Sequence, residues 1–213
     1  MRWMVTSYTA DDIRALVEAG IALTSELSLD AILQKLVDVA RRQVNARYAA
    51  ISVLDDGGGI AQFVTSGITA EERARIGDIP QGRGLLGVLL HEGASLRLAD
   101  MAGDARSVGF PANHPPMSSL LGVPVVSRGR IIGNLYLTDK QGDETFDDRD
   151  EEIVRLLATQ AAAAIETSRL QDSLESLARL EERERIAMDL HDGVIQTVYA
   201  VALHLEDAAD RVR

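Results

Sequence analysis

The first group of residues with chemical potential lies near the C-terminal end. His191 is followed at once by Asp192 and, five residues later, by Gln196. A phosphoacceptor histidine needs an exposed ring nitrogen, and a neighbouring carboxylate that orients the other ring proton makes it a better nucleophile. Asp192 has this position, and the Gln196 amide could hold a water molecule for dephosphorylation. A plain surface histidine on a charged helix is the alternative for any single His.

The second group combines a histidine in a proline-rich loop with a tyrosine 22 residues later. Pro111, Pro115 and Pro116 surround His114 and restrict the backbone near its ring. A rigidly held imidazole is what an axial haem ligand requires, and the Tyr136 phenol could donate to a diatomic ligand on the iron. Alternatively, His114 donates to a backbone carbonyl in a structural turn, and Tyr136 is an ordinary strand residue.

The elements that must position these side chains follow from hydrophobic spacing. Alternation along residues 131–138 places Asn134, Tyr136 and Thr138 on one face of a strand, with Leu135 and Leu137 on the other. The same reasoning predicts further strands at 48–54, 60–66, 95–98 and 120–127, and helices at 69–76 and 81–91 and twice within 9–45. Ser28 and Thr69 are the expected N-caps, the latter with Glu72. This order predicts an α+β fold, an antiparallel sheet flanked by helices, with a small-molecule pocket.

The region after Asp147 contains no proline, and its only glycine is Gly193. It is predicted to form one long helix or two nearly collinear helices. Apolar residues continue at coiled-coil spacing beyond Ile165, namely at Leu170, Leu174, Leu177 and Leu180. We therefore expect a domain at 1–167 and, at 168–213, a helix that forms a homodimer. The alternative is a C-terminal helix packed on its own domain.

Composition excludes several classes of function. The 213 residues include 22 Lys and Arg against 33 Asp and Glu, and the net charge of −11 argues against nucleic-acid binding. The absence of cysteine excludes disulfides, thiolate metal sites and thioether-linked tetrapyrroles, but not a tetrapyrrole held by histidine. No stretch approaches ~18 apolar residues, so no membrane segment is expected. The N-terminus lacks the pattern of a signal peptide, which predicts a cytoplasmic protein.

The string ERERIAMDLHDGVIQ at 182–196 resembles the phosphoacceptor box of the nitrate/nitrite-sensor-like sensor histidine kinases. The resemblance covers about 180–205. It implies that His191 is the autophosphorylation site, Asp192 the general base and Gln196 a phosphatase residue, with a cognate response regulator as partner. Members of this family continue into an ATP-binding domain. No glycine-rich phosphate loop occurs before Arg213, so we expect a sensor half that ends in the first dimerisation helix, with ATP bound only by the missing domain.

The layout of residues 9–170 resembles a GAF domain, a ligand-sensing module. The segments HPPM at 114–117, LGVP at 121–124 and GNLYLTDK at 133–140 resemble the haem-binding GAF domains of actinobacterial dormancy-type sensor kinases. That resemblance, over about 48–140, implies that His114 is the proximal ligand of a b-type haem. It also implies that Tyr136 is the distal residue and that Phe63 packs near the haem. Arg106 and Arg128 could reach the haem propionates, although their spacing does not establish it.

These expectations combine into one hypothesis. The chain is the sensory region of a cytoplasmic two-component sensor histidine kinase, whose GAF domain binds haem and senses O2, NO, CO or redox state. Its signal passes along the helix from Asp147 and controls phosphorylation of His191. The alternative is a GAF domain that binds a non-haem small ligand or serves only for dimerisation. The Soret absorption band of haem separates the two.

Overall fold

The computed structural model describes residues 28–77, 82, 84–111, 113–142 and 145–210. The chain divides into two compact units, Met1–Thr167 and Ser168–Arg213, which are described separately below. The first of the two helices predicted within 9–45 lies outside the described residues. No helix in the described part of the chain is both long and apolar enough to cross a membrane.

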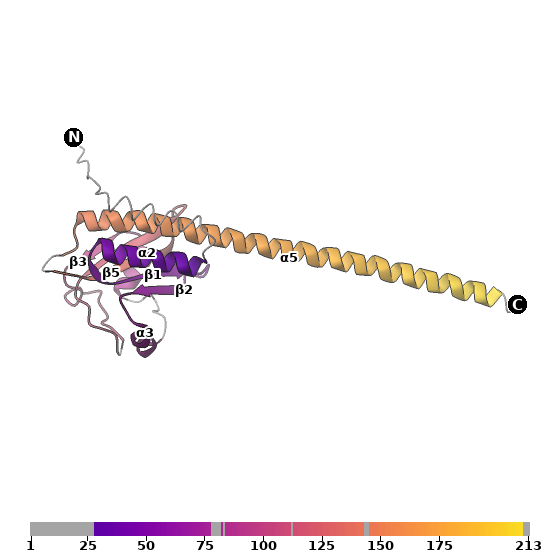
Figure 1. Ribbon diagram of the computed structural model, residues 1–213, viewed down its shortest axis with the longest axis horizontal. Helices are drawn as coiled ribbons and strands as arrows, with labels where there is room; N and C mark the ends of the chain where they lie inside the picture. Colours follow the sequence, from indigo (N-terminus) through magenta and orange to yellow (C-terminus); the bar gives the residue numbers. More distant parts are fainter. Residues whose placement is uncertain (1–27, 78–81, 83, 112, 143–144, 211–213) are drawn as a thin grey trace, which may run out of the picture. The chain divides into compact units, whose positions relative to one another are not determined.

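The first unit is built on a five-stranded sheet with the order β2-β1-β5-β4-β3 (Figure 1). All neighbouring strands are antiparallel. The strands are β1 (Ala46–Leu54), β2 (Ile60–Ser66), β3 (Leu96–Leu98), β4 (Leu120–Ser127) and β5 (Arg130–Lys140). The predicted α+β fold is therefore confirmed. The last strand in the sequence, β5, lies in the middle of the sheet, so both of its edges are paired.

One face of the sheet packs against helices. Leu135 and Leu137 of β5 are fully buried in a large apolar cluster that includes residues of α2 (Leu29–Gln43) and of the first part of α5 (Asp148–Asp210). Figure 1 shows α2 and this part of α5 on the same side of the sheet. Ser28 caps α2 as predicted, since its side chain accepts from the Ala31 amide. This buried layer fixes the register of β5, because a one-residue slip would exchange its two faces.

The opposite face is covered by shorter elements. They are α3 (Ala70–Ile76), α4 (Leu85–Glu92) and the loop between β3 and β4. Thr69 and Glu72 form the expected capping box: the Thr69 hydroxyl accepts from the Glu72 amide at 3.2 Å, and the Glu72 carboxylate accepts from the Thr69 amide at 2.8 Å. A smaller apolar cluster around Tyr136 lies on this face.

Several predicted boundaries were wrong. The helix predicted from Gln81 begins at Leu85, because Gly82 and Gly84 have positive φ values of 66° and 64° that a right-handed helix cannot contain. The central strands β1 and β5 also extend two residues or so beyond their predicted ends, since they pair with each other from Ala46 opposite Lys140 to Val53 opposite Gly133. Backbone pairing continues there after the apolar alternation has ended.

The start of α5 is tied to the end of β5. Asp147 and Asp150 exchange hydrogen bonds between amide and carboxylate at 3.0 and 2.8 Å, which caps the helix. Asp150 also pairs with the Lys140 ammonium at 2.7 Å, and both side chains are about nine-tenths buried. Asp147 and Asp150 therefore cap the helix, and Asp150 also takes part in a buried ion pair.

The second unit, Ser168–Arg213, contains the C-terminal part of α5, which ends at Asp210. Ion pairs one turn apart join Arg179 to Glu175 and Arg185 to Glu182. The four leucines predicted to form a coiled-coil seam are 55–66% exposed in this single chain, namely Leu170, Leu174, Leu177 and Leu180. A helix that exposes a row of leucines has an unsatisfied apolar stripe, which a second helix would cover.

Candidate functional site

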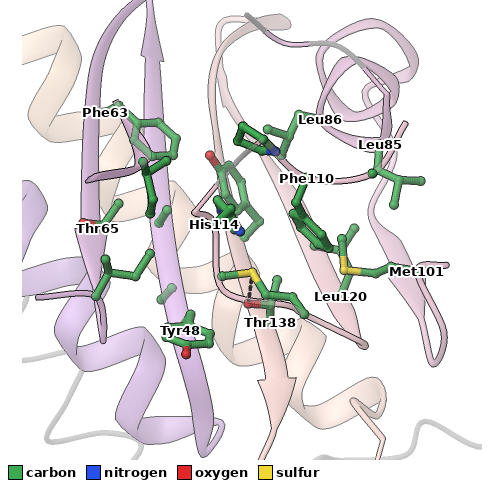
Figure 2. A pocket seen from close by; sticks show the side chains of 18 of the residues that line it. Tyr48, Phe63, Thr65, Leu85, Leu86, Met101, Phe110, His114, Leu120 and Thr138 are labelled. Atoms are coloured by element: carbon green, nitrogen blue, oxygen red, sulfur yellow. Dashed lines mark hydrogen bonds between the residues drawn. The ribbon is translucent and has the colours of Figure 1, made fainter. Parts of the chain in front are cut away.

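An apolar cavity of about 440 Å³ lies on the side of the sheet opposite α2. Its wall comes from β1, β2 and β5, and its cover from α3, α4 and the loop before β4. Figure 2 shows Phe63 on one side of this space, Leu85 and Leu86 on the other, and His114 between them. The volume is within the usual range of small-molecule sites, ~300–1,000 Å³. The apolar lining favours a ligand with a large apolar surface.

His114 reaches the cavity from the proline-rich loop. Its Nδ1 lies 2.8 Å from the Pro115 carbonyl oxygen, and its ring stacks on Phe110 with centroids 4.8 Å apart. A carbonyl oxygen can only accept, so Nδ1 carries the proton and donates it. In the neutral ring, Nε2 then keeps a free lone pair, and it has no hydrogen-bond partner among the described residues. This donation to a backbone carbonyl is the contact expected for a structural turn, and it is also the arrangement of a metal-ligating histidine, whose other ring nitrogen donates to a carbonyl.

Tyr136 lines the same cavity from the centre of β5. The residue is 8% exposed, and its hydroxyl is buried with no hydrogen-bond partner among the described residues. Burial raises the pKa of Tyr136, while the positive charge of Arg73 acts weakly in the opposite direction. The phenol therefore stays neutral and can donate. An unsatisfied buried hydroxyl costs free energy, so a ligand that accepts its proton would be stabilised.

Phe63 is the third predicted site residue, and it also lines the cavity. Its ring centroid lies 6.0 Å from that of Tyr136, at an interplanar angle of 38°. The structure thus brings His114, Tyr136 and Phe63 to one cavity, although they come from a loop and two non-adjacent strands. Their roles toward a cofactor stay predictions.

Hydrogen bonds tie the His114 loop to the strand that carries Tyr136. The Thr138 hydroxyl lies 3.0 Å from the Met117 sulfur, and the Asp139 carboxylate accepts from both the amide and the hydroxyl of Ser118, at 2.7 and 3.0 Å. These bonds fix where the loop meets β5. Sequence reasoning missed them because they join residues 21 positions apart with no local pattern.

The arginines proposed from sequence for an anionic group do not line the cavity. Arg106 instead makes two hydrogen bonds to the Asp104 carboxylate, at 2.9 and 2.8 Å, and these hold the pKa of Asp104 at about 2. Arg128 sits in the turn between β4 and β5 with a positive φ of 48°. The arginine that does line the cavity is Arg73 of α3, which sequence reasoning did not single out.

The second predicted site, on α5, is described in part. His191 is exposed, as a phosphoacceptor must be. The side chains of Asp192 and Gln196 lie outside the described residues, so their roles as general base and phosphatase residue stay predictions. Among the described residues, no group of three or more His, Asp or Glu side chains could hold a bare metal ion.

Two family models match the chain. Residues 26–166 match the model described as GAF domain, and residues 182–213 match the one described as histidine kinase. Sensor histidine kinase YhcY of Bacillus subtilis (strain 168) is 33% identical over 81 residues, which cover 38% of this chain and 21% of YhcY. The aligned part is thus about a fifth of that curated relative. The predicted resemblance to GAF-containing sensor histidine kinases is confirmed. The resemblance to haem-binding GAF domains stays a prediction.

Solved structures show the same fold at low identity. The GAF domain of a phosphoenolpyruvate-protein phosphotransferase from Coxiella burnetii is 20% identical, with a TM-score of 0.67 over 78% of this chain and 99% of that one. The GAF domain of a putative sensor histidine kinase from Pseudomonas syringae pv. tomato is 22% identical, with a TM-score of 0.54 over 78% and 93%. At such identity, these matches show the fold of the chain and do not identify a ligand.

Proposed function

The chain belongs to the GAF domain family, and because it continues into a histidine kinase segment, we propose that it is the sensory region of a cytoplasmic two-component sensor histidine kinase. In this proposal the cavity binds b-type haem through His114. Tyr136 would lie beside the haem, and the site would sense O2, NO, CO or redox state. The response controls phosphorylation of His191, with ATP bound by a separate kinase domain and a response regulator as the phosphoryl acceptor.

The observation that carries the proposal is the state of the His114 ring. Nδ1 donates to the Pro115 carbonyl, which leaves Nε2 as the free ligand atom at the wall of an apolar cavity. A single histidine would be sufficient to hold a haem iron, because the porphyrin itself supplies four nitrogen ligands. The aromatic and aliphatic lining suits the porphyrin faces. When bound, the haem supplies reversible binding of a diatomic gas or a one-electron change at iron.

The protein side chains would then have separate tasks. The Pro115 carbonyl and the stacked Phe110 ring orient the imidazole and fix its tautomer. The neutral Tyr136 phenol donates a hydrogen bond toward a bound gas, which satisfies a hydroxyl that otherwise has none. Phe63 packs beside Tyr136 and limits the space around it.

The route out of the cavity begins at β5. Tyr136 and Thr138 belong to the cavity wall, and Lys140 at the end of the same strand is ion-paired with Asp150 in the first turn of α5. The ligand can influence α5 only through different affinity for two signalling states. A small rotation or register shift in a paired α5 helix is the bistable element that we propose. The exposed leucine seam supports the homodimer that this requires.

Absorption spectroscopy of the 213-residue chain, expressed with haem supplied, tests the proposal. We expect a Soret band that His114→Ala abolishes and that the matched His191→Ala retains, because only His114 lines the cavity. Tyr136→Phe should retain the band and raise the O2 dissociation rate about tenfold, the value of one lost hydrogen bond. A wild-type chain without a Soret band would refute haem binding and leave the cavity to a non-haem ligand.

Phosphotransfer tests the other half of the proposal. A supplied kinase domain of a related sensor kinase, together with labelled ATP, should label the wild-type chain and His114→Ala but not His191→Gln. Labelling of His191→Gln would refute the assignment of the phosphoacceptor.

Size-exclusion chromatography with light scattering checks the homodimer, which Leu174→Glu should disrupt because it places a charge in the seam.

A further inference from the structure

Arg73 is the one permanently charged side chain among the described residues that line the cavity. It is half-buried on α3, and its guanidinium carbon lies 5.9 Å from the centre of the Phe63 ring. One of its terminal nitrogens donates to the Gly77 carbonyl. A guanidinium has five N–H donors, so most of them are left for another partner.

Arg73 differs from the arginines that have a counter-charge in this acidic chain. Five of them form ion pairs with carboxylates: Arg97, Arg106, Arg155, Arg179 and Arg185. Arg73 forms none with any residue in the described part of the chain. No described carboxylate lines the cavity, so the wall of the cavity offers Arg73 no counter-charge. A cation at an apolar wall is stabilised by an anion that brings the missing charge.

We propose that Arg73 binds a carboxylate of the cavity's ligand, so that the ligand class is an amphipathic anion with a planar apolar body. The apolar body lies against Phe63, Leu85 and Met117, and the carboxylate accepts from the guanidinium at the α3 wall. The inference rests on the proposed function in requiring a small ligand in this cavity. If that ligand is haem, the carboxylate is a propionate.

A matched pair of fluorescent probes tests Arg73 without haem. Pyrenebutyrate and pyrenebutanol share a planar apolar body and differ in a carboxylate against a hydroxyl. Fluorescence anisotropy titrations of the 213-residue chain should give tighter binding for pyrenebutyrate. Arg73→Gln should weaken pyrenebutyrate about tenfold, the value of one charge-assisted hydrogen bond, and leave pyrenebutanol unchanged.

Arg75→Gln is the control variant. Arg75 lies on the same helix, and its substitution removes the same charge. The Arg75 side chain is exposed and does not line the cavity. It should leave both probes unchanged, and Arg73→Lys should restore much of the preference for the anion. The inference is overturned if the wild-type chain does not prefer pyrenebutyrate, or if Arg73→Gln and Arg75→Gln weaken it equally. It is also overturned if Arg73→Gln weakens both probes alike with an unchanged thermal midpoint.

Haem and its dimethyl ester separate this inference from the proposed function. The ester keeps the iron and the apolar body but has no free propionate. The wild-type chain could show a Soret band that depends on His114 and bind haem and the ester with equal affinity. That result would support haem binding and refute the role of Arg73. If neither compound gives a Soret band, haem binding fails, and the pyrene probes still decide for or against Arg73.

Discussion

The two faces of β5 are made by alternate residues of one strand, yet they are packed very differently. Leu135 and Leu137 are fully enclosed by α2, α5 and the neighbouring strands. Tyr136, between them, faces the cavity, and its hydroxyl has no hydrogen-bond partner in the described part of the chain. The helix side therefore supplies stability, and the cavity side leaves interactions open for a ligand. The site is the part of the sheet where packing is incomplete.

Leucine-to-alanine substitutions on the two sides of the sheet should give the largest difference in stability. Leu137 on the helix side and Leu120 on the cavity side are both essentially inaccessible. Leu137→Ala should lower the free energy of unfolding by about 4 kcal/mol, since it opens a void in a dense core. Leu120→Ala should cost about 2 kcal/mol, because the side chain already borders empty space and loses fewer contacts.

Urea unfolding followed by circular dichroism measures both values. The same two variants also differ in binding, since only Leu120 lines the cavity. Leu120→Ala should change the affinity for pyrenebutanol, and Leu137→Ala should not. Equal losses of stability together with equal changes in affinity would mean that the two faces are not functionally separate.

The ion pair at the end of β5 should have the next largest effect. Asp150→Asn leaves the Lys140 ammonium buried without its counter-charge, while the amide oxygen can still accept from the Asp147 amide. We expect a loss of about 3 kcal/mol in the free energy of unfolding. Asp148→Asn is the control, since its side chain is 96% exposed and its pair with Arg97 is on the surface. A loss below that of the control would show that Lys140 finds another partner.

The sequence predicts the two faces of the sheet because side chains in a strand alternate with period two. Local capping patterns also predict the starts of α2 and α3, at Ser28 and Thr69. The order of elements predicts a pocket, and the sequence places His114, Tyr136 and Phe63 at it. The role of Arg73 depends on where α3 lies above β2, and the tie between Ser118 and Asp139 depends on a tertiary contact. No local spacing encodes either.

High pH should reveal the buried phenol. The folded state raises the pKa of Tyr136, whereas the unfolded chain ionises near the ordinary value of about 10. Below that pH the two states bind the same proton, and the stability is fully present. Above it the unfolded state alone loses the proton, so the free energy of unfolding falls by about 1.4 kcal/mol per pH unit.

Tyr136→Phe is the variant that isolates this contribution in urea titrations between pH 9 and 11. Above the ordinary tyrosine pKa, the free energy of unfolding should fall less steeply with pH in Tyr136→Phe than in the wild type. The difference is the contribution of about one proton. Tyr48→Phe serves as a comparison, because its ring also lines the cavity wall. An unchanged slope in Tyr136→Phe would mean that the hydroxyl reaches water in solution.

At neutral pH the same Tyr136→Phe substitution should have the smallest effect and the opposite sign. Removal of an unsatisfied buried hydroxyl should raise the free energy of unfolding by about 1 kcal/mol in the ligand-free chain. With ligand present, the wild type should recover the difference, because its hydroxyl then donates. Thermal midpoints of both proteins with and without ligand measure this, and a destabilised ligand-free Tyr136→Phe would show that the hydroxyl is already satisfied.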